Sequence, residues 1–207
     1  MATKKQLVQQ LGVVAGFEDP AVDLEQYRTP PGLAAHLIHT ADLRGDIENR
    51  TVLDLGCGTG MLGLAAALRG PSAVVGVDID PEPLSTAREN ERRVGTTTPL
   101  GWVLGDVTRL GLSPSGPTTV VTNPPFGAQT GNEHADRRFL AAAARVADTS
   151  YSLHNAGSRE FVEAFVTDQG GTVTHAYAAD LAVPRSFEFH EADRQVIDVE
   201  LFRTDWS

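Results

Sequence analysis

Apolar segments of strand length alternate with longer segments of helical periodicity along most of this chain. This alternation, punctuated by Gly, Pro and Asp, is typical of a parallel sheet with helices on both faces. The last two expected strands have no helix between them, which favours an antiparallel pair at that end of the sheet. The expected strands are residues 51–55, 73–77, 102–104, 118–122, 149–153, 172–178 and 195–203, and the expected helices are residues 4–14, 32–42, 60–68, 81–94, 137–147 and 158–168.

The chain has 207 residues, of which 41% are hydrophobic, enough to bury the core of one domain. We therefore expect a single domain over residues 1–207. Cys57 is the one cysteine, which excludes an internal disulfide, and no Cys/His cluster indicates a metal site. The N-terminus lacks the apolar core of a signal peptide, and no apolar run is long enough to cross a bilayer. These features favour a cytoplasmic protein.

The charge balance is acidic. Net charge is −10, and only two of the 17 basic residues, Lys4 and Lys5, are lysines. An acidic surface favours solubility, and it also fits adaptation to high intracellular salt. The balance argues against a nucleic-acid binder that depends on a broad basic patch, but it leaves room for an enzyme that grips RNA locally.

A glycine-rich segment, Asp54-Leu55-Gly56-Cys57-Gly58-Thr59-Gly60, follows the first expected strand and opens a helix. Glycines here allow a tight turn and close approach of the backbone to a ligand. Gly58, Gly60 and Gly63 match the G-x-G-x-x-G pattern of dinucleotide sites, so NAD is one possible ligand. S-adenosylmethionine is the other, because Asp54 would sit badly beside a pyrophosphate and well beside a cationic amino group.

Two further acids follow the next two expected strands. In Asp78-Ile79-Asp80, the first carboxylate is placed to bind ribose hydroxyls. In Gly105-Asp106-Val107, Asp106 is placed to accept a hydrogen bond from an adenine amino group. Helix capping is the competing interpretation for Asp80 and Asp106. We expect Cys57 to serve packing rather than thiol chemistry.

The tetrapeptide Asn123-Pro124-Pro125-Phe126 directly follows the apolar strand expected at 118–122. Prolines lack a backbone N–H and favour an extended conformation at the preceding residue, so this loop presents mainly acceptors. Such acceptors suit a planar NH2 group, and Phe126 offers a flat face for stacking. The alternative is a rigid turn with no catalytic role.

Taken together, these motifs resemble the seven-stranded S-adenosylmethionine-dependent methyltransferases. The segment Leu24-Glu25-Gln26-Tyr27-Arg28-Thr29-Pro30 is similar to the N-terminal signature of the methyltransferase-like protein 5 family, adenine-N6 methyltransferases of small-subunit ribosomal RNA. Tyr151-Ser152-Leu153-His154 and Phe187-Glu188-Phe189-His190 are also similar, and Arg28 departs from a proline common in relatives. The resemblance covers nearly the whole chain and is of the archaeal type.

The resemblance implies an α/β, Rossmann-like seven-stranded sheet, mostly parallel with an antiparallel C-terminal strand. Residues 1–48 would form a helical cap with a loop covering the cofactor, and residues 49–207 the core. It also implies a structured RNA substrate and a small zinc-binding activator subunit as partner. The cofactor site would comprise Gln26, Thr29, Asp54, Gly56, Cys57, Gly58, Thr59, Gly60, Met61, Asp78, Ile79, Asp106, Val107 and Asn123, and the catalytic loop would comprise Asn123, Pro124, Pro125 and Phe126.

Three other functions compete with this interpretation. A glutamine-amide methyltransferase acting on a translation release factor would also present a planar NH2 group to the loop. A non-catalytic, cofactor-binding scaffold on the ribosome is a second alternative, opposed by the intact acceptor loop. An NAD-dependent oxidoreductase is the third, but no catalytic Tyr-Lys pair is evident. Gln26, Tyr27 and Phe126 favour adenine.

Overall fold

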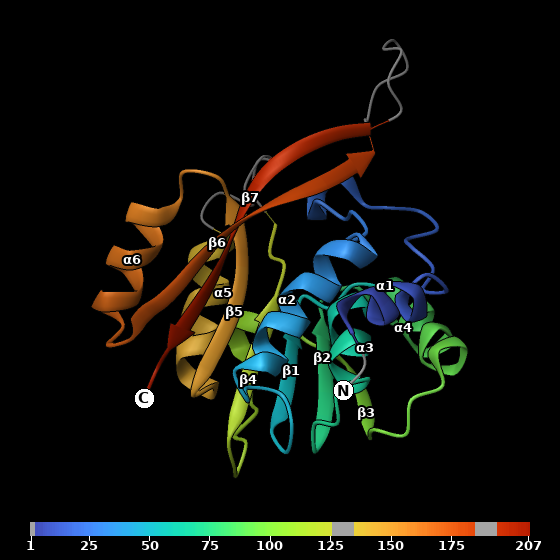
Figure 1. Cartoon of the computed structure of the whole chain (residues 1–207), viewed down its shortest axis with the longest axis horizontal. Helices are drawn as coiled ribbons and strands as arrows, with labels where there is room; N and C mark the ends of the chain where they lie inside the picture. Colours follow the sequence, from blue (N-terminus) through green and yellow to red (C-terminus); the bar gives the residue numbers. More distant parts are fainter. Residues whose placement is uncertain (1–2, 126–134, 185–193) are drawn as a thin grey trace.

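The computed structural model describes residues 3–125, 135–184 and 194–207. A seven-stranded sheet in the order β3-β2-β1-β4-β5-β7-β6 forms its centre (Figure 1). β7 runs antiparallel to both of its neighbours, and the other strands share one direction. The strands are β1 (Thr51–Leu55), β2 (Ala73–Asp78), β3 (Leu100–Leu104), β4 (Thr118–Thr122), β5 (Thr149–Asn155), β6 (Thr172–Pro184) and β7 (Arg194–Asp205).

The register brings the carboxyl ends of the central strands together. Leu55 at the end of β1 pairs with Val77 of β2 and with Thr122 of β4, and Asp78 pairs with Leu104 of β3. The loops after these strands therefore leave the sheet at a common edge, where open α/β sheets bind ligands.

Helices cover both faces of the sheet. On one face, α1 (Lys4–Leu11), α2 (Pro31–Leu43) and α3 (Met61–Ala67) share a core with residues of β1, β4, β5 and β7. On the same face, α4 (Pro81–Val94) packs beside β2 and β3. The opposite face is covered by α5 (Ala135–Val146) and α6 (Arg159–Asp168), whose buried residues form two further clusters. Short 3-10 turns lie at Val22–Leu24 (η1) and Val107–Arg109 (η2).

The expected fold class is confirmed, with local differences. α1 ends at Leu11 rather than near Val14, because Gly12 caps the helix, although Val14 is still buried. β6 and β7 are longer than expected, and they pair with each other as expected. β7 lies between β5 and β6, an order that the sequence did not predict.

A buried polar cluster ties β5 and β7 to the loop before β1. The carboxylate of Asp46 accepts a hydrogen bond of 2.7 Å from the Tyr151 hydroxyl and one of 2.8 Å from Nε of Arg203. Asp46 is 4% exposed, so the guanidinium compensates a charge that burial would otherwise penalise. Within the described residues, no helix has the length and apolar character needed to span a membrane.

Candidate active site

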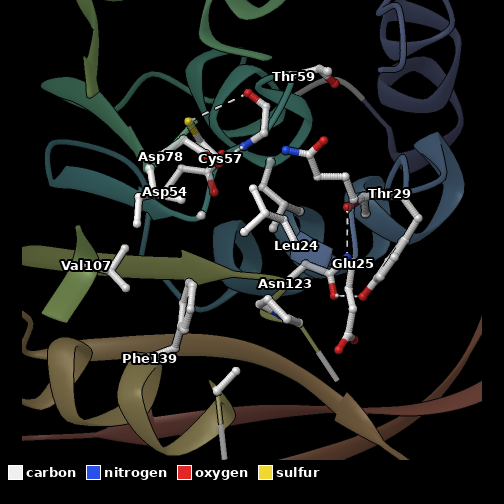
Figure 2. A pocket seen from close by; sticks show the side chains of 18 of the residues that line it. Leu24, Glu25, Thr29, Asp54, Cys57, Thr59, Asp78, Val107, Asn123 and Phe139 are labelled. Carbon is white, nitrogen blue, oxygen red and sulfur yellow. Dashed lines mark hydrogen bonds between the residues drawn. The ribbon is translucent and has the colours of Figure 1, made fainter. Parts of the chain in front are cut away.

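A cavity of about 420 Å³ opens at the carboxyl edge of the sheet (Figure 2). This volume lies within the roughly 300–1,000 Å³ typical of small-molecule sites. The lining comes from segments far apart in the chain: residues within 17–29, 54–62, 78–79, 105–108, 123–125 and 135–139. The site therefore depends on the folded sheet rather than on one continuous motif.

The glycine loop forms the floor of the cavity. Gly56 and Gly58 have φ of +67° and +51°, which L side chains rarely adopt. A Cβ at Gly56 would lie 2.8 Å from Cε1 of Phe139, and one at Gly58 would lie 2.8 Å from Cζ of Phe17. Glycine is thus required by backbone conformation and by two aromatic rings that close over the loop.

Two buried carboxylates lie together on one side of the cavity (Figure 2). Oδ2 of Asp54 accepts a hydrogen bond of 2.7 Å from the Gly63 N–H, and Oδ2 of Asp78 accepts one of 2.7 Å from the Gly58 N–H. Burial raises the pKa of Asp54 to about 7, the Gly63 bond opposes the rise, and the charge of Asp78 adds to it. Burial also raises the pKa of Asp78. Among the described residues neither acid belongs to an ion pair, so this side of the cavity favours a cation.

Asp80 and Asp106 both cap short-range structure, as the competing interpretation held. Asp80 caps α4 by accepting from the Glu82 N–H, and its other oxygen accepts 2.7 Å from Nε2 of Gln26. Asp106 caps η2 through Thr108, whose backbone and hydroxyl bonds lower the pKa of this acid. Asp106 also lines the cavity, so capping and ligand binding are compatible there.

Asn123 is held from two sides by the N-terminal segment. Its Nδ2 donates 3.0 Å to Oγ1 of Thr29, and its Oδ1 accepts 3.3 Å from the hydroxyl of Tyr27 (Figure 2). Burial raises the pKa of Tyr27 far above its usual range, so this hydroxyl remains a donor. Since a carbonyl oxygen has two lone pairs, Oδ1 keeps one for a further donor.

Most of the predicted site residues meet in this cavity. Gly60 and Pro124 do not line it: Gly60 begins α3 with φ of +87° against Trp102. Phe126 and His190 lie outside the described residues. The predicted residues that line the cavity are Gln26, Thr29, Asp54, Gly56, Cys57, Gly58, Thr59, Met61, Asp78, Ile79, Asp106, Val107, Asn123 and Pro125.

Sequence reasoning missed several lining residues, most of them apolar. Phe17, Leu24 and Phe139 line the cavity, as does the exposed Arg138. The loop that contains Phe17 has no hydrophobic periodicity from which a site residue could be predicted. The one signal for Phe139 was its position as an aromatic residue in an otherwise alanine-rich helix. Cys57 is buried with a raised thiol pKa, in keeping with a packing role.

Another residue that the sequence did not single out, Asn90, fixes the segment before Phe17. Its side chain is fully buried and pairs with both backbone groups of Ala15, accepting 2.8 Å from N–H and donating 3.0 Å to C=O. Nδ2 also donates 3.0 Å to the carbonyl of Thr59 in the glycine loop. One amide therefore joins α4 to the segment before Phe17 and to the glycine loop.

Comparison with known proteins assigns the family. Residues 33–162 match the family model "Methyltransferase small domain". The rRNA N(6)-adenosine-methyltransferase Mettl5 of Drosophila melanogaster is 34% identical over 96% of this chain and 94% of its own. This chain belongs to the Mettl5 family.

Archaeal proteins resemble this Mettl5-family chain over its full length. MJ0284 of Methanocaldococcus jannaschii, an uncharacterized protein, is 36% identical over 99% of this chain and 95% of its own. The crystal structure of PH1948 from Pyrococcus horikoshii, described as a candidate RNA methyltransferase, superposes with a TM-score of 0.88 at 37% identity. That match covers 99% of this chain and 98% of PH1948.

The Mettl5-family protein is therefore a methyltransferase, and S-adenosylmethionine is its cofactor. The cavity suits this molecule, because the buried Asp54 favours its cationic amino group and would repel the pyrophosphate of a dinucleotide. The glycine floor leaves room for the ligand to approach the backbone. The NAD alternative is excluded by the family, and S-adenosylmethionine is confirmed.

Proposed function

We propose that this methyltransferase modifies N6 of an adenine in small-subunit ribosomal RNA. Relatives from Drosophila melanogaster and Danio rerio, both 34% identical over 96% of this chain, are named rRNA N(6)-adenosine-methyltransferases. The structural observation that carries the proposal is the position of Asn123. Its amide is fixed by two hydrogen bonds beside an acid-lined cofactor cavity, and it begins a loop that presents acceptors.

The cofactor residues follow from the chemistry of the lining. Asp54 would bind the cationic amino group, and Asp78 would accept from the ribose hydroxyls. Ile79, Asp106 and Val107 would hold the adenine ring, the acid accepting from its amino group. Gln26 and Thr29 would cover the ligand above Gly56, Cys57, Gly58, Thr59 and Met61, with Gly60 shaping the turn. When bound, the cofactor supplies an activated methyl group on a sulfonium.

The substrate adenine would enter from the side of Asn123, after leaving its stack. Oδ1 of Asn123 and the carbonyl of Pro124 would accept the two N–H bonds of the N6 amine, with Phe126 stacking on the ring. These bonds favour a localised lone pair on nitrogen and direct it into the cavity. Alignment and electrostatics would therefore account for most of the lowering of the activation barrier. A strong base is unnecessary, because the amine becomes acidic once it gains a methyl group.

We further infer a small activator subunit as partner. β3 is an edge strand of the sheet, and Val103 and Leu104 on it are 41% and 59% exposed. An apolar edge of this kind favours a partner that covers it. A partner with basic residues would also supply RNA contacts that this acidic chain has in small number.

The test is a methylation assay with labelled S-adenosylmethionine and unmodified small-subunit rRNA, with and without a zinc-binding activator subunit. The digested nucleosides are read by mass spectrometry. We expect label in N6-methyladenosine at one position, lost in Asn123→Ala and kept in the matched control Asn155→Ala, whose exposed side chain lies at the end of β5. Cofactor affinity should be the same in both variants.

Other outcomes identify the competing functions. Label on a glutamine of a translation release factor, with none on RNA, would reassign the enzyme to protein methylation. Cofactor binding without transfer to RNA or protein, even with the activator subunit present, would favour the scaffold. Normal turnover in Asn123→Ala would remove that residue from the mechanism.

A further inference from the structure

A cluster of basic and aromatic side chains lies between α2 and β6, outside the catalytic cavity. We call it the α2–β6 patch and define it as His36, Arg44, His175 and Tyr177. α2 packs against the edge strand β6, on the face of the sheet that also carries α1 and α3. None of these four residues lines the cavity.

The aromatic rings of the patch lie close to one another, and two of them are parallel. The rings of His175 and Tyr177 are stacked, with centroids 6.0 Å apart and 5° between their planes. His36 meets Tyr177 edge-on at 6.4 Å. The three residues are only partly buried, so each keeps some surface exposed to solvent. Aromatic and histidine rings at a surface are platforms for unpaired bases.

A positioned guanidinium lies beside this platform. Nη2 and Nε of Arg44 donate to the hydroxyl oxygen of Tyr177 at 2.6 and 3.2 Å, and the guanidinium carbon is 6.0 Å from the ring centroid. Arg44 is exposed, and it enters none of the ion pairs between described residues. Most of its N–H groups therefore remain for a phosphate oxygen.

Basic side chains lie near the two histidines of the patch. The pKa of His175 is lowered by burial and by the charges of Arg44 and Arg203, and that of His36 by burial, Lys4 and His39. Arg203 is paired with Asp46, so Arg44 is the charge that the patch offers. An exposed guanidinium beside aromatic rings thus suits an anion that also carries flat apolar groups.

We propose that the α2–β6 patch binds the substrate RNA outside the catalytic cavity, with Arg44 on a phosphate and the His175–Tyr177 platform on an unpaired base. This inference rests on the proposed function. α2 begins at Pro31, two residues after Thr29 in the cavity wall. At about 1.5 Å per residue, Arg44 lies about 20 Å along the helix from that end, within reach of a few nucleotides.

The experiment compares wild type, Arg44→Gln and Tyr177→Ala on a small-subunit rRNA fragment that the wild type methylates. Arg92→Gln is the matched control, because Arg92 is exposed on α4, beside the opposite end of the sheet. Arg44→Gln should weaken RNA binding severalfold and lower the slope of log affinity against log salt by about 1. Tyr177→Ala should weaken RNA binding by about 5-fold or more.

The readouts separate binding from chemistry. KM for RNA should rise in both patch variants, while kcat at saturating RNA and the cofactor Kd stay at wild-type values. Arg92→Gln should match the wild type throughout. A thermal unfolding curve checks that each variant is folded, and the exposed Arg44→Gln keeps the test decisive if Tyr177→Ala unfolds.

Three results would overturn the inference. Unchanged RNA affinity and salt slope in Arg44→Gln, with a wild type that methylates RNA, would reject the patch and leave the proposed function standing. Lost affinity for an activator protein in place of RNA would assign the patch to a protein contact. A wild type that methylates no ribosomal RNA would instead reject the proposed function, and the patch with it.

Discussion

The hydroxyl of Tyr27 donates a 3.3 Å hydrogen bond to Oδ1 of Asn123, a residue 96 positions further along the chain. With the bond from Nδ2 of Asn123 to Thr29, it fixes both ends of the amide. A side chain that must present one oxygen to a substrate gains from this restraint, because it loses no rotational freedom when the substrate binds.

Tyr27→Phe should therefore lower kcat by about 2- to 10-fold, the range expected when a hydrogen bond of roughly 0.5–1.5 kcal/mol is lost. Cofactor Kd should stay near the wild-type value, because the phenyl ring still packs at the cavity. Steady-state methylation kinetics measure the effect. Thr29→Val provides the companion variant, because it removes the acceptor of the second hydrogen bond that restrains the same amide, and it should lower kcat to a similar extent. A wild-type kcat in both variants would show that these bonds do not position Asn123.

Cofactor affinity should depend on pH through Asp54, whose pKa burial raises to about 7. Binding of a cationic amino group requires the ionised carboxylate, so the affinity should rise about tenfold between pH 5.5 and 7. Over that range an α-amino group of pKa about 7.7 stays mostly protonated. Titration calorimetry in buffers of different ionisation enthalpy should detect proton release. The affinity for methylthioadenosine, which lacks the amino-acid moiety, should not depend on pH in this way. An equal pH dependence for both ligands would show that Asp54 does not bind the amino group.

Asp54→Asn should stabilise the cofactor-free protein while weakening cofactor binding. The folded state holds the Asp54 proton more tightly than the unfolded chain, where the pKa is about 3.9. The free energy of unfolding therefore falls as pH rises from about 4 to about 7. Asn removes this loss and can still accept from the Gly63 N–H. Its Tm should exceed that of the wild type at pH 8 by more than at pH 5, with little further rise on adding S-adenosylmethionine.

The control for that variant is Asp106→Asn, since Thr108 lowers the pKa of Asp106. An acid with a lowered pKa stabilises the fold at neutral pH, so its replacement should bring no gain in Tm at pH 8. If Asp54→Asn were less stable than the wild type at pH 8, the carboxylate would have a cationic partner in the free protein.

Gly58→Ala should impair cofactor binding, because it combines a φ of +51° with a Cβ only 2.8 Å from Phe17. Gly45→Ala is the matched control, with φ of +73° and no atom within 4 Å of the added Cβ. Both variants should lose roughly 1 kcal/mol of stability from backbone strain. Only Gly58→Ala should raise the cofactor Kd, as measured by calorimetry. Equal Kd values in the two variants would show that the Phe17 contact does not shape the site.

The sequence predicted the local parts of this molecule better than their assembly. Strand–helix alternation and the glycine loop follow from residue type and spacing, because turns and caps are decided by neighbouring residues. The insertion of β7 between β5 and β6 is decided by contacts such as Arg203 with Asp46, which are distant in sequence. Phe17 and Phe139 were missed for the same reason: only the folded sheet brings their rings over the glycines.

The acids around the cavity were predicted only in part. Asp54 and Asp78 line the cavity as expected, since strand ends place them there. Asp80 was expected either to cap or to bind, yet it also accepts from Gln26, which no local pattern indicates. The Tyr27–Asn123 bond could not be predicted either, although both residues stood in motifs singled out for other reasons.

Asn90 joins the backbone at Ala15 to the loop at Thr59, so one buried amide adds to the bonds that hold the N-terminal segment against the rest of the cavity. During synthesis the first thirty residues leave the ribosome long before the strand that ends at Thr122. These residues therefore have no surface to dock on until the rest of the sheet has been synthesised. A fragment beginning after residue 30 would keep the glycines and acids but expose them to water. The N-terminal segment supplies one wall of the cavity, so we expect methyl transfer to require that this segment has docked on the completed sheet.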